Sequence, residues 1–482
     1  MIKPNALSKA RFFRGYMKRK FALILALVLV LCCMSSCNKN KAAKPDGSLP
    51  DYDKKIDELS ISIGGWLVPS DLTEEQYVYM KESGIDTFYF AQAGDPAYYI
   101  DVNSITEQDQ AVLLKMEEYG LNAILHVGAK TNDKLVNIAN AAPYNAVTGI
   151  CYDEPDKEQI NQITTCLDII NQNPGNKTLF VNLYPSGSYK RNGFYTYKSY
   201  LRYFCENILA NLTVGEKWLS ADRYPLTFDK KGNKILDSKW LCDMEALATV
   251  RKDYPDVKTN FFIQTIPYGG EVYPAGTEGS RDRIPTYEDV RMQEYTALAF
   301  GFDRISCFCY GTPCVYSEFT EEQVGMIDRD GNRTSIYYAT AKANNEIKAF
   351  DHVLKQFEWQ GVFTNDGGKT TDTKRLTNRK IFAKLKNRTP INKIGGLDKV
   401  YSTQDTLFGH FLDFESNAGY MVVNLNDTSL NLTDQVTMTF EQDYGYKKAL
   451  CYIGGQKQIL EIVNNALTLD LGVGEGVFVI PY

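Results

Sequence analysis

The sequence is poor in residues that bind transition metals, with only 3 histidines among 482 residues and no Cys-X-X-Cys pair. A zinc site is therefore not expected. The chain also lacks the glycine-rich turn of dinucleotide-binding folds and the phosphate-binding P-loop, so we predict no cofactor. The formal net charge of −6 excludes the basic footprint of a nucleic-acid-binding protein.

The N-terminus combines a basic stretch with a short apolar run. Residues 1–36 carry seven Lys and Arg and no acid, and Phe21–Leu31 is too short to span a bilayer. Ser35 and Ser36 precede Cys37, an arrangement that resembles a bacterial lipoprotein signal. It implies a signal peptide over 1–36, a lipid on Cys37 and a flexible tether over 37–57. Lipidation at Cys32 or Cys33, or an ordinary secretory signal, is the alternative.

Export would change the charge of the protein and its location. Removing those seven cations from a chain of net charge −6 leaves −13. We expect an exported protein that is lipid-anchored to the bacterial cell envelope, at the cell surface or on the periplasmic side. Its membrane contact is then the N-terminal lipid.

Residues 58–356 repeat a pattern in which a short apolar run precedes an amphipathic, helix-like stretch. The runs are Ile61–Val68, Thr87–Gln92, Asn122–Val127, Val147–Tyr152, Thr178–Tyr184, Trp218–Ala221, Asn260–Thr265 and Arg304–Tyr310. Alternation of strand and helix predicts parallel pairing, and eight repeats over about 300 residues is the size of a (β/α)8 TIM barrel. An open doubly wound sheet is the alternative.

The period of the pattern changes near Phe357. Short segments then alternate apolar and polar residues between turn signals such as Gly454-Gly455. The segments are Lys380–Lys386, His410–Glu415, Tyr420–Asn424, Val436–Phe440, Lys448–Ile453, Gln458–Val463 and Gly476–Tyr482. They predict an antiparallel β-sandwich domain over 357–482.

Polar and aromatic residues follow the predicted barrel strands. Catalytic groups of such barrels lie at the C-terminal ends of strands, so these residues share one rim. Amides and acids bind sugar hydroxyls, and aromatic rings pack on sugar C–H surfaces, so an oligo- or polysaccharide is the expected partner. The candidate substrate-binding residues are Trp66, His126, Asn182, Tyr184, Tyr224, Gln264, Tyr268 and Tyr310.

The strongest chemical signal is Asp153-Glu154-Pro155 after the fourth predicted strand. Adjacent carboxylates repel, which favours a proton on one of them, and protonation of a glycosidic oxygen needs such an acid. The alternative is that Asp153 caps the following helix. A metal-dependent hydrolase is disfavoured because His126 is the only histidine in the predicted strands.

Three segments carry a family resemblance. Ile150-Cys-Tyr-Asp-Glu-Pro155 resembles the strand-4 acid/base motif of barrel glycoside hydrolases. Asn182-Leu-Tyr-Pro185 and Asp222-Arg-Tyr-Pro225 resemble motifs of glycoside-hydrolase-like lipoproteins from gut bacteria. The resemblance spans about residues 60–350 and the sandwich. It implies that Glu154 is the general acid/base, with Asp153 in support.

The second carboxylate does not follow the common retaining pattern, which has a glutamate at the end of strand 7. Here Gln264 occupies that place, and Glu271 follows in a loop. Asp222 could supply the second carboxylate. The mechanism could also be substrate-assisted, because an Asp-Glu pair resembles that of β-N-acetylhexosaminidases. The sequence therefore predicts a glycosidase, with a non-catalytic glycan-binding lipoprotein as the alternative.

Overall fold

The computed structural model describes residues 47–48, 51–52, 59–91, 97–102, 104–126, 138–172, 175, 177–229, 233–237, 239–268, 283–315, 319–368 and 382–482. The predicted signal peptide and most of the predicted tether lie outside these ranges, as does Glu271. Within the ranges, no helix is both long enough and apolar enough to cross a membrane.

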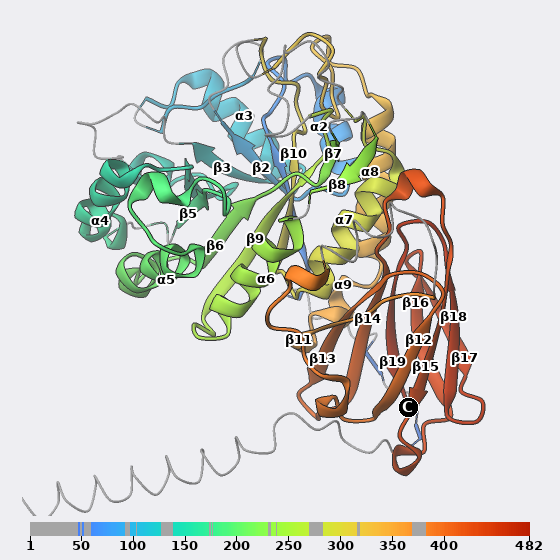
Figure 1. Cartoon of the computed structure of the whole chain (residues 1–482). Helices are drawn as coiled ribbons and strands as arrows, with labels where there is room; N and C mark the ends of the chain where they lie inside the picture. The colour runs from blue at the N-terminus through green and yellow to red at the C-terminus, as the bar shows by residue number, and fades with distance from the viewer. Residues whose placement is uncertain are drawn as a thin grey trace, which may run out of the picture.

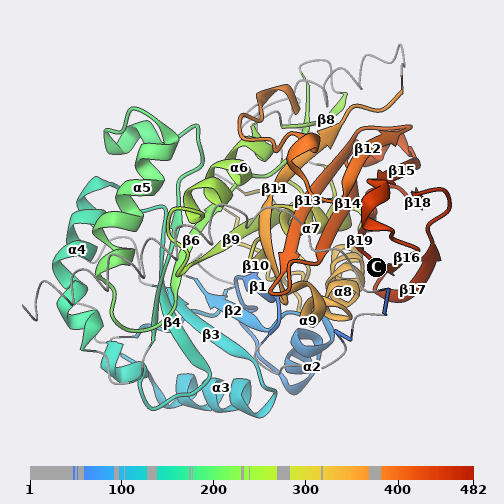
Figure 2. The ribbon, with the colours of Figure 1, turned by 90° about the horizontal axis from the view of Figure 1, so that it is seen from below.

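Eight parallel strands close into a barrel in the order β1-β10-β9-β6-β5-β4-β3-β2 (Figures 1 and 2). The strands are β1 Ser62–Trp66, β2 Thr87–Phe90, β3 Asn122–His126, β4 Val147–Asp153, β5 Thr178–Leu183, β6 Lys217–Asp222, β9 Val257–Gln264 and β10 Arg304–Phe308. A two-stranded hairpin, β7 Leu226–Phe228 with β8 Lys234–Leu236, follows β6. The predicted TIM barrel is confirmed.

Helices cover the outside of the ring. They are α2 Glu74–Glu82, α3 Glu107–Glu118, α4 Lys157–Asn171, α5 Tyr197–Asn207, α6 Trp240–Arg251, α7 Tyr287–Ala299, α8 Ser335–Lys348 and α9 Asp351–Leu354. Helices α3 and α7 begin with capping boxes, in which Thr106 pairs with Asp109 and Thr286 with Asp289. Between β3 and β4, the described residues Ile138–Ala141 form a 3-10 helix.

Alternate residues of the strands serve two separate cores. Phe88, Leu125, Ile150, Leu179 and Leu219 pack toward the helices in the main core. Their inward-facing neighbours form a second cluster inside the barrel, which includes Tyr89, Ile124, Cys151, Phe180 and Trp218. This alternation decides which residues reach the barrel mouth, because a side chain two positions further along a strand points the same way.

Two antiparallel sheets form the C-terminal sandwich. The larger sheet has the order β11 Phe357–Asn365, β13 Thr406–Asp413, β14 Ala418–Asn424, β19 Gly476–Pro481, β16 Lys448–Ile453 and β17 Gln456–Glu461. The smaller has the order β12 Leu397–Ser402, β15 Asp434–Phe440 and β18 Ala466–Leu471. The predicted sandwich is confirmed, but the strand expected over Lys380–Lys386 is wrong: residues 382–384 are helical, and Glu245 accepts hydrogen bonds from the backbone N–H groups of Lys386 and Asn387.

Helix α7 joins the two domains. It lies between the barrel and the larger sheet, as Figure 1 shows. The Trp359 indole N–H donates to the Ala299 carbonyl oxygen at the end of α7 (2.9 Å). A Cβ added at Gly409 would come within 2.3 Å of that same oxygen, and one at Gly476 within 2.2 Å of the Tyr295 ring. Glycine at these two positions lets the sheet approach the helix this closely.

The N-terminal part of the described chain is fixed to this joint. The Tyr52 hydroxyl donates to Asp413 Oδ2 at the end of β13 (2.6 Å). The Gln356 side-chain amide donates to the Tyr52 carbonyl oxygen (3.0 Å). Tyr52 is buried, and its ring packs 5.1 Å from that of Phe357. The chain therefore first docks on the sandwich and only then enters β1.

A buried carboxyl lies in the middle of α7. Glu294 is fully buried, and neither of its carboxyl oxygens has a hydrogen-bond partner among the described residues. Burial raises the pKa of Glu294 well above its usual value, and the charge of Glu346 adds to the shift. The folded protein therefore holds Glu294 in its neutral form, whereas the unfolded chain ionises it near pH 4.

This burial predicts a pH-dependent stability. Because the folded-state pKa is raised, the contribution of Glu294 is fully present below about pH 4 and falls as the pH rises toward the folded pKa. The free energy of unfolding of Glu294→Gln, taken relative to that of the wild type, should therefore increase by roughly 1 kcal/mol or more when the pH is raised from 5 to 8. Urea unfolding at the two pH values measures this, with Glu358→Gln on the exposed face of β11 as the control. An equal effect at both pH values would contradict the assignment.

Candidate active site

Two carboxyl groups from different strands meet at the C-terminal end of the barrel. Asp153 ends β4 and Asp222 ends β6. Asp222 is partly buried, and its Oδ2 accepts a hydrogen bond from the Tyr224 hydroxyl (3.1 Å). Its Oδ1 is shielded from solvent and has no partner in the described part of the chain. Burial, followed by the nearby charge of Asp153, raises the pKa of Asp222 to about 7.

Asp153 is the more exposed member of this pair. Its Oδ1 accepts a hydrogen bond from the Asn182 side-chain amide of β5 (3.1 Å). Asn182 is buried and in turn accepts a hydrogen bond from the Ser220 hydroxyl of β6 (3.0 Å). Asn182 and Ser220 are direct neighbours in the strand register, so the barrel itself fixes the amide that orients Asp153.

Glu154 has an unusual backbone conformation. Its φ of 42° lies in the left-handed region, and its N–H donates to the Asn182 carbonyl oxygen (2.9 Å). A glutamate in this region is uncommon, and such positions gather at functional sites. Its side chain is partly exposed. The sequence pattern emphasised repulsion between the neighbouring carboxylates of Asp153 and Glu154. In the structure, the charge of Asp153 instead contributes to the raised pKa of Asp222, which lies on another strand.

Aromatic rings form the floor of the barrel mouth. Trp66, which ends β1, contacts the His126 ring of β3 edge-on (5.8 Å between centroids) and the Phe262 ring of β9 (5.5 Å). Burial lowers the pKa of His126 to about 4, so the ring is neutral at neutral pH. Its Nδ1 is buried without a partner among the described residues. Within the same residues, no group of three or more His, Cys, Asp or Glu side chains is arranged to hold a metal ion.

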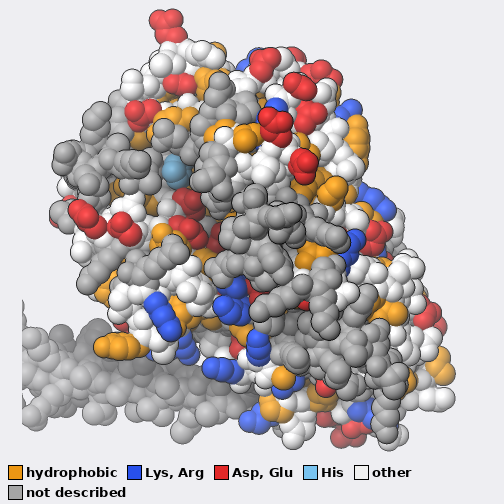
Figure 3. Space-filling view, turned by 45° about the horizontal axis from the view of Figure 1, so that its top comes forward, with side chains coloured by type: hydrophobic (Ala, Val, Ile, Leu, Met, Phe, Trp, Pro, Cys, Tyr) orange, Lys and Arg blue, Asp and Glu red, His pale blue; other side chains and the backbone are white. Residues whose placement is uncertain are grey.

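A second aromatic group lies beside the carboxyl pair. The Tyr224 ring stacks on Phe308 of β10 (4.8 Å) and meets Tyr268 edge-on (5.6 Å). Tyr268 also packs near Phe319 (6.0 Å). Figure 3 turns the top of the molecule in Figure 1 toward the viewer and shows a hollow in which acidic side chains and a histidine gather. The described site thus combines carboxyl groups with ring faces and edges.

Two residues that the sequence predicts to bind substrate, Gln264 and Tyr310, are buried and make contacts within the protein. Gln264 is fully buried: its Oε1 accepts from the Leu226 N–H (3.0 Å), and its Nε2 donates to the carbonyl oxygens of Ile266 (3.3 Å) and Tyr268 (3.0 Å). Tyr310 lies in the main core, where its ring meets Phe88 (5.0 Å). Both side chains are buried in protein contacts, and sugar contacts of Gln264 and Tyr310 stay predictions. Partly buried Tyr184 also packs against the main core.

The loop that carries Asp222 and Tyr224 is anchored by charges that the sequence pattern did not reveal. Arg223 forms two ion pairs: its Nε lies 2.6 Å from Asp237 Oδ2, and its guanidinium lies 3.7 Å from Asp243 Oδ2 of α6. Asp243 also accepts from the Ser186 N–H after β5 (3.1 Å). Burial raises the pKa of Asp243 to about 6, while Arg223 opposes that shift. The only sequence signal was the arginine of the segment Asp222-Arg-Tyr-Pro225.

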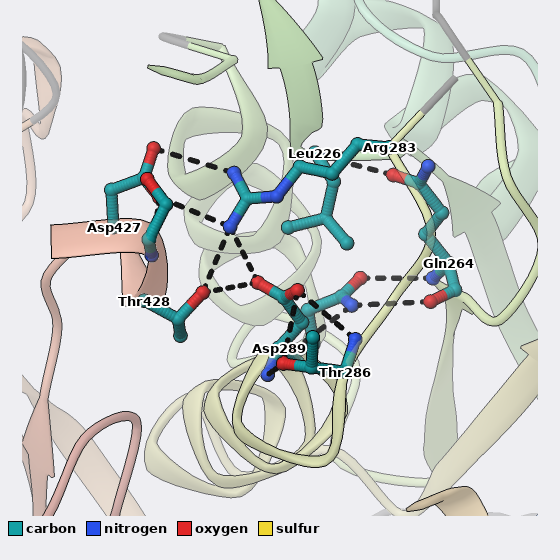
Figure 4. A network of polar contacts seen from close by, with 9 residues as sticks. Leu226, Gln264, Arg283, Thr286, Asp289, Asp427 and Thr428 are labelled. Atoms are coloured by element: carbon teal, nitrogen blue, oxygen red, sulfur yellow. Dashed lines mark hydrogen bonds and ion pairs between the residues drawn. The ribbon is translucent and has the colours of Figure 1, made fainter. Parts of the chain in front are cut away.

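Figure 4 shows how the sandwich supports this rim. The buried Arg283 guanidinium lies 2.6 Å from Asp289 Oδ1 of α7 and 3.0 Å from Asp427 Oδ1 of the sandwich. One helical turn further along α7, Gln293 exchanges hydrogen bonds with the backbone of Gln264 (2.8 and 3.2 Å). Arg283 thereby closes the joint between the two domains.

Comparisons with known proteins return no matching family model and no matching curated protein. Among solved structures, the neighbours include glycoside hydrolases of several families. A family 39 glycoside hydrolase from Bacteroides cellulosilyticus WH2 is 10% identical, with 90% of this chain and 82% of that chain covered (TM-score 0.46).

Two further neighbours have similar values. A family 42 β-galactosidase from G. stearothermophilus is 8% identical, with 88% and 98% of the two chains covered (TM-score 0.48). A family 27 β-L-arabinopyranosidase from Geobacillus stearothermophilus is 11% identical, with 88% and 96% covered (TM-score 0.44).

The bonds of Gln264 predict the result of placing an acid at the end of strand 7. A carboxylate cannot donate to the carbonyl oxygens of Ile266 and Tyr268, so Gln264→Glu should lose about 1–3 kcal/mol of unfolding free energy. We expect no gain in any hydrolytic activity. Urea denaturation measures the loss, with Gln110→Glu on exposed α3 as the control. Unchanged stability together with increased hydrolysis would show that position 264 faces the substrate.

Proposed function

We propose that this protein hydrolyses glycosidic bonds of an extracellular or periplasmic oligo- or polysaccharide. One observation carries the proposal: Asp153 and Asp222, from β4 and β6, lie together at the barrel mouth, where burial and then the charge of Asp153 raise the pKa of Asp222 to about 7. Two interacting carboxyl groups, one ionised and one protonated, are the groups that glycoside hydrolysis uses. The surrounding rings of Trp66, Tyr224 and Tyr268 provide surfaces on which a sugar can pack.

In this proposal Glu154 is the general acid/base that protonates the glycosidic oxygen. Its left-handed backbone and partial exposure at the end of β4 favour a functional rather than a purely structural role. The pair of Asp153 and Asp222 supplies the second carboxylate, with one proton held between them below about pH 7. The pair acts either as nucleophile or, in a substrate-assisted reaction, by orienting an N-acetyl group of the substrate.

Substitution of the carboxyl groups tests the proposal. We expect Glu154→Gln and Asp222→Asn each to lower kcat/KM by about 100- to 10,000-fold on any glycan that the wild type cleaves. The wild-type rate should change as the pH passes through about 7, because the charge of the carboxyl pair then changes, and Asp222→Asn should remove that transition. Reducing-sugar release from a glycan panel measures both effects, with the exposed Glu158→Gln in α4 as the control.

The glycan panel also distinguishes a reaction with an enzyme nucleophile from a substrate-assisted reaction, and both of these from a non-catalytic role. Cleavage confined to substrates with an N-acetyl group would favour the substrate-assisted reaction. Binding of a glycan with no release of product, unchanged in Glu154→Gln, would overturn the enzymatic proposal and favour a glycan-binding protein. The buried amide of Gln264 in place of a strand-7 acid is the observation that favours this second function.

We also propose that the protein is exported and anchored to the bacterial cell envelope by a lipid on Cys37. The support is the sequence of the first 37 residues, in which a basic stretch, an apolar run and small residues precede the cysteine. We expect wild-type protein in the detergent phase of a Triton X-114 extract and Cys37→Ser in the aqueous phase. Cys451→Ser, at a buried sandwich cysteine, is the control. Detergent partitioning of Cys37→Ser would overturn the proposal.

A further inference from the structure

A continuous row of polar side chains crosses the interior of the barrel. It begins at Arg304 of β10, whose guanidinium donates to the Tyr89 hydroxyl (3.4 Å). The Tyr89 hydroxyl bonds with Ser306 Oγ (3.2 Å), and Ser306 donates to Asn260 Oδ1 (2.7 Å). Tyr89, Ser306 and Asn260 have no solvent-exposed surface.

The row continues to the rim through the strands next in the barrel. The Asn260 side-chain amide donates to Ser220 Oγ (2.9 Å), and Ser220 donates to Asn182 Oδ1 (3.0 Å). Asn182 then donates to Asp153 Oδ1 (3.1 Å). We call these seven residues the polar row: Arg304, Tyr89, Ser306, Asn260, Ser220, Asn182 and Asp153.

The ends of the polar row fix the direction of its hydrogen bonds. A guanidinium can only donate, and an ionised carboxylate can only accept. Ser220 and Ser306 each give their single hydrogen to the next residue toward the rim, so Tyr89 must donate to Ser306. Every donor therefore points from Arg304 toward Asp153. Aligned hydrogen bonds polarise one another, especially in a dry interior.

Arg304 is an unusual source for such a row, because it is a buried cation without a direct ionic partner. In the described part of the chain no carboxylate forms an ion pair with it, and its guanidinium lies over the Trp218 ring (4.1 Å). Its Nε donates to Ser62 Oγ (2.9 Å), and Ser62 donates to Asp86 Oδ1 (2.7 Å). Its charge thus reaches carboxylates only through hydroxyl and amide groups.

We propose that the polar row holds Asp153 oriented and ionised, so that the proton of the carboxyl pair stays on Asp222. Arg304, Ser306, Asn260 and Ser220 are then positioning residues, since they act on the site through Asn182. The inference deepens the proposed function, because it assigns a charge state to each member of the pair. It depends on the contacts inside the barrel and holds whatever sugar the site accepts.

Other ionisable groups near Asp153 and Asp222 do not explain why one carboxyl group is ionised while the other keeps the proton. His126 of β3 is neutral, and Cys151 of β4 is a buried thiol whose pKa is raised by burial. The pKa of Tyr224 is raised by burial too, so it stays a neutral donor to Asp222. Glu154 follows Asp153 directly in the chain and is the proposed general acid/base. The charge of Arg223 lowers the pKa of Asp222, and its ion pairs are with Asp237 and Asp243.

The experiment interrupts the row at two points. Ser220→Ala and Ser306→Ala each remove one hydroxyl link, and both are prepared in the full chain with 13Cγ-labelled aspartate. NMR titration follows the two carboxyl signals, which Asp153→Asn and Asp222→Asn assign by their disappearance. We expect the lower apparent pKa of the pair to rise by about half a unit or more and the upper one not to fall, because the row stabilises ionised Asp153. Ser402→Ala, which removes a buried sandwich hydroxyl, should leave both values unchanged.

Wild-type titration curves in both folded row variants would overturn the inference. A shift of the same size in Ser402→Ala would also overturn it, because any lost buried hydroxyl would then suffice. If one row variant does not fold, the other decides. The titration needs no substrate, so a failure of glycan hydrolysis would leave its result intact. Conversely, hydrolysis that depends on Glu154 would stand even if the row had no effect.

Discussion

Closure of eight parallel strands into a ring is the constraint on which the site depends. Strand direction brings all C-terminal ends to one mouth, and the two-residue alternation decides which side chains face the axis. Asp153, Asn182 and Asp222 lie two positions beyond the inward-facing Cys151, Phe180 and Ser220 and are therefore directed to the same space. Asp153 and Asp222, more than 60 positions apart in sequence, thus become neighbours.

The order of strands and the carboxylates at their ends could be predicted from the sequence, because apolar runs and turn residues report local structure. The predicted acid at Asp222 and the amide at Asn182 do lie beside Asp153. Contacts made by single side chains could not be predicted. Gln264 and Tyr310 follow strands just as Tyr224 does, yet both are buried, since their surroundings come from distant segments.

The polar row escaped sequence reasoning for a related reason. Ser220 and Ser306 are each flanked by apolar residues, and Asn260 directly precedes the apolar Phe261 and Phe262, so each polar residue looks like a tolerated exception. Only the ring closure shows that they share a layer and satisfy one another. A buried polar group is costly unless paired, so each of these residues is acceptable only in the company of the others. In the sequence the three polar residues look unrelated, and only the folded structure shows that they bond to one another.

The docking of Tyr52 on Asp413 has a mechanical consequence. A lipid on Cys37 would be connected to the folded body through Tyr52, and therefore through the sandwich. A pull on that connection would load the joint between sandwich and α7 before it reached any barrel strand. The sandwich would then attach the protein to its membrane and set the direction in which the barrel mouth faces. This role would not require the sandwich itself to bind a sugar.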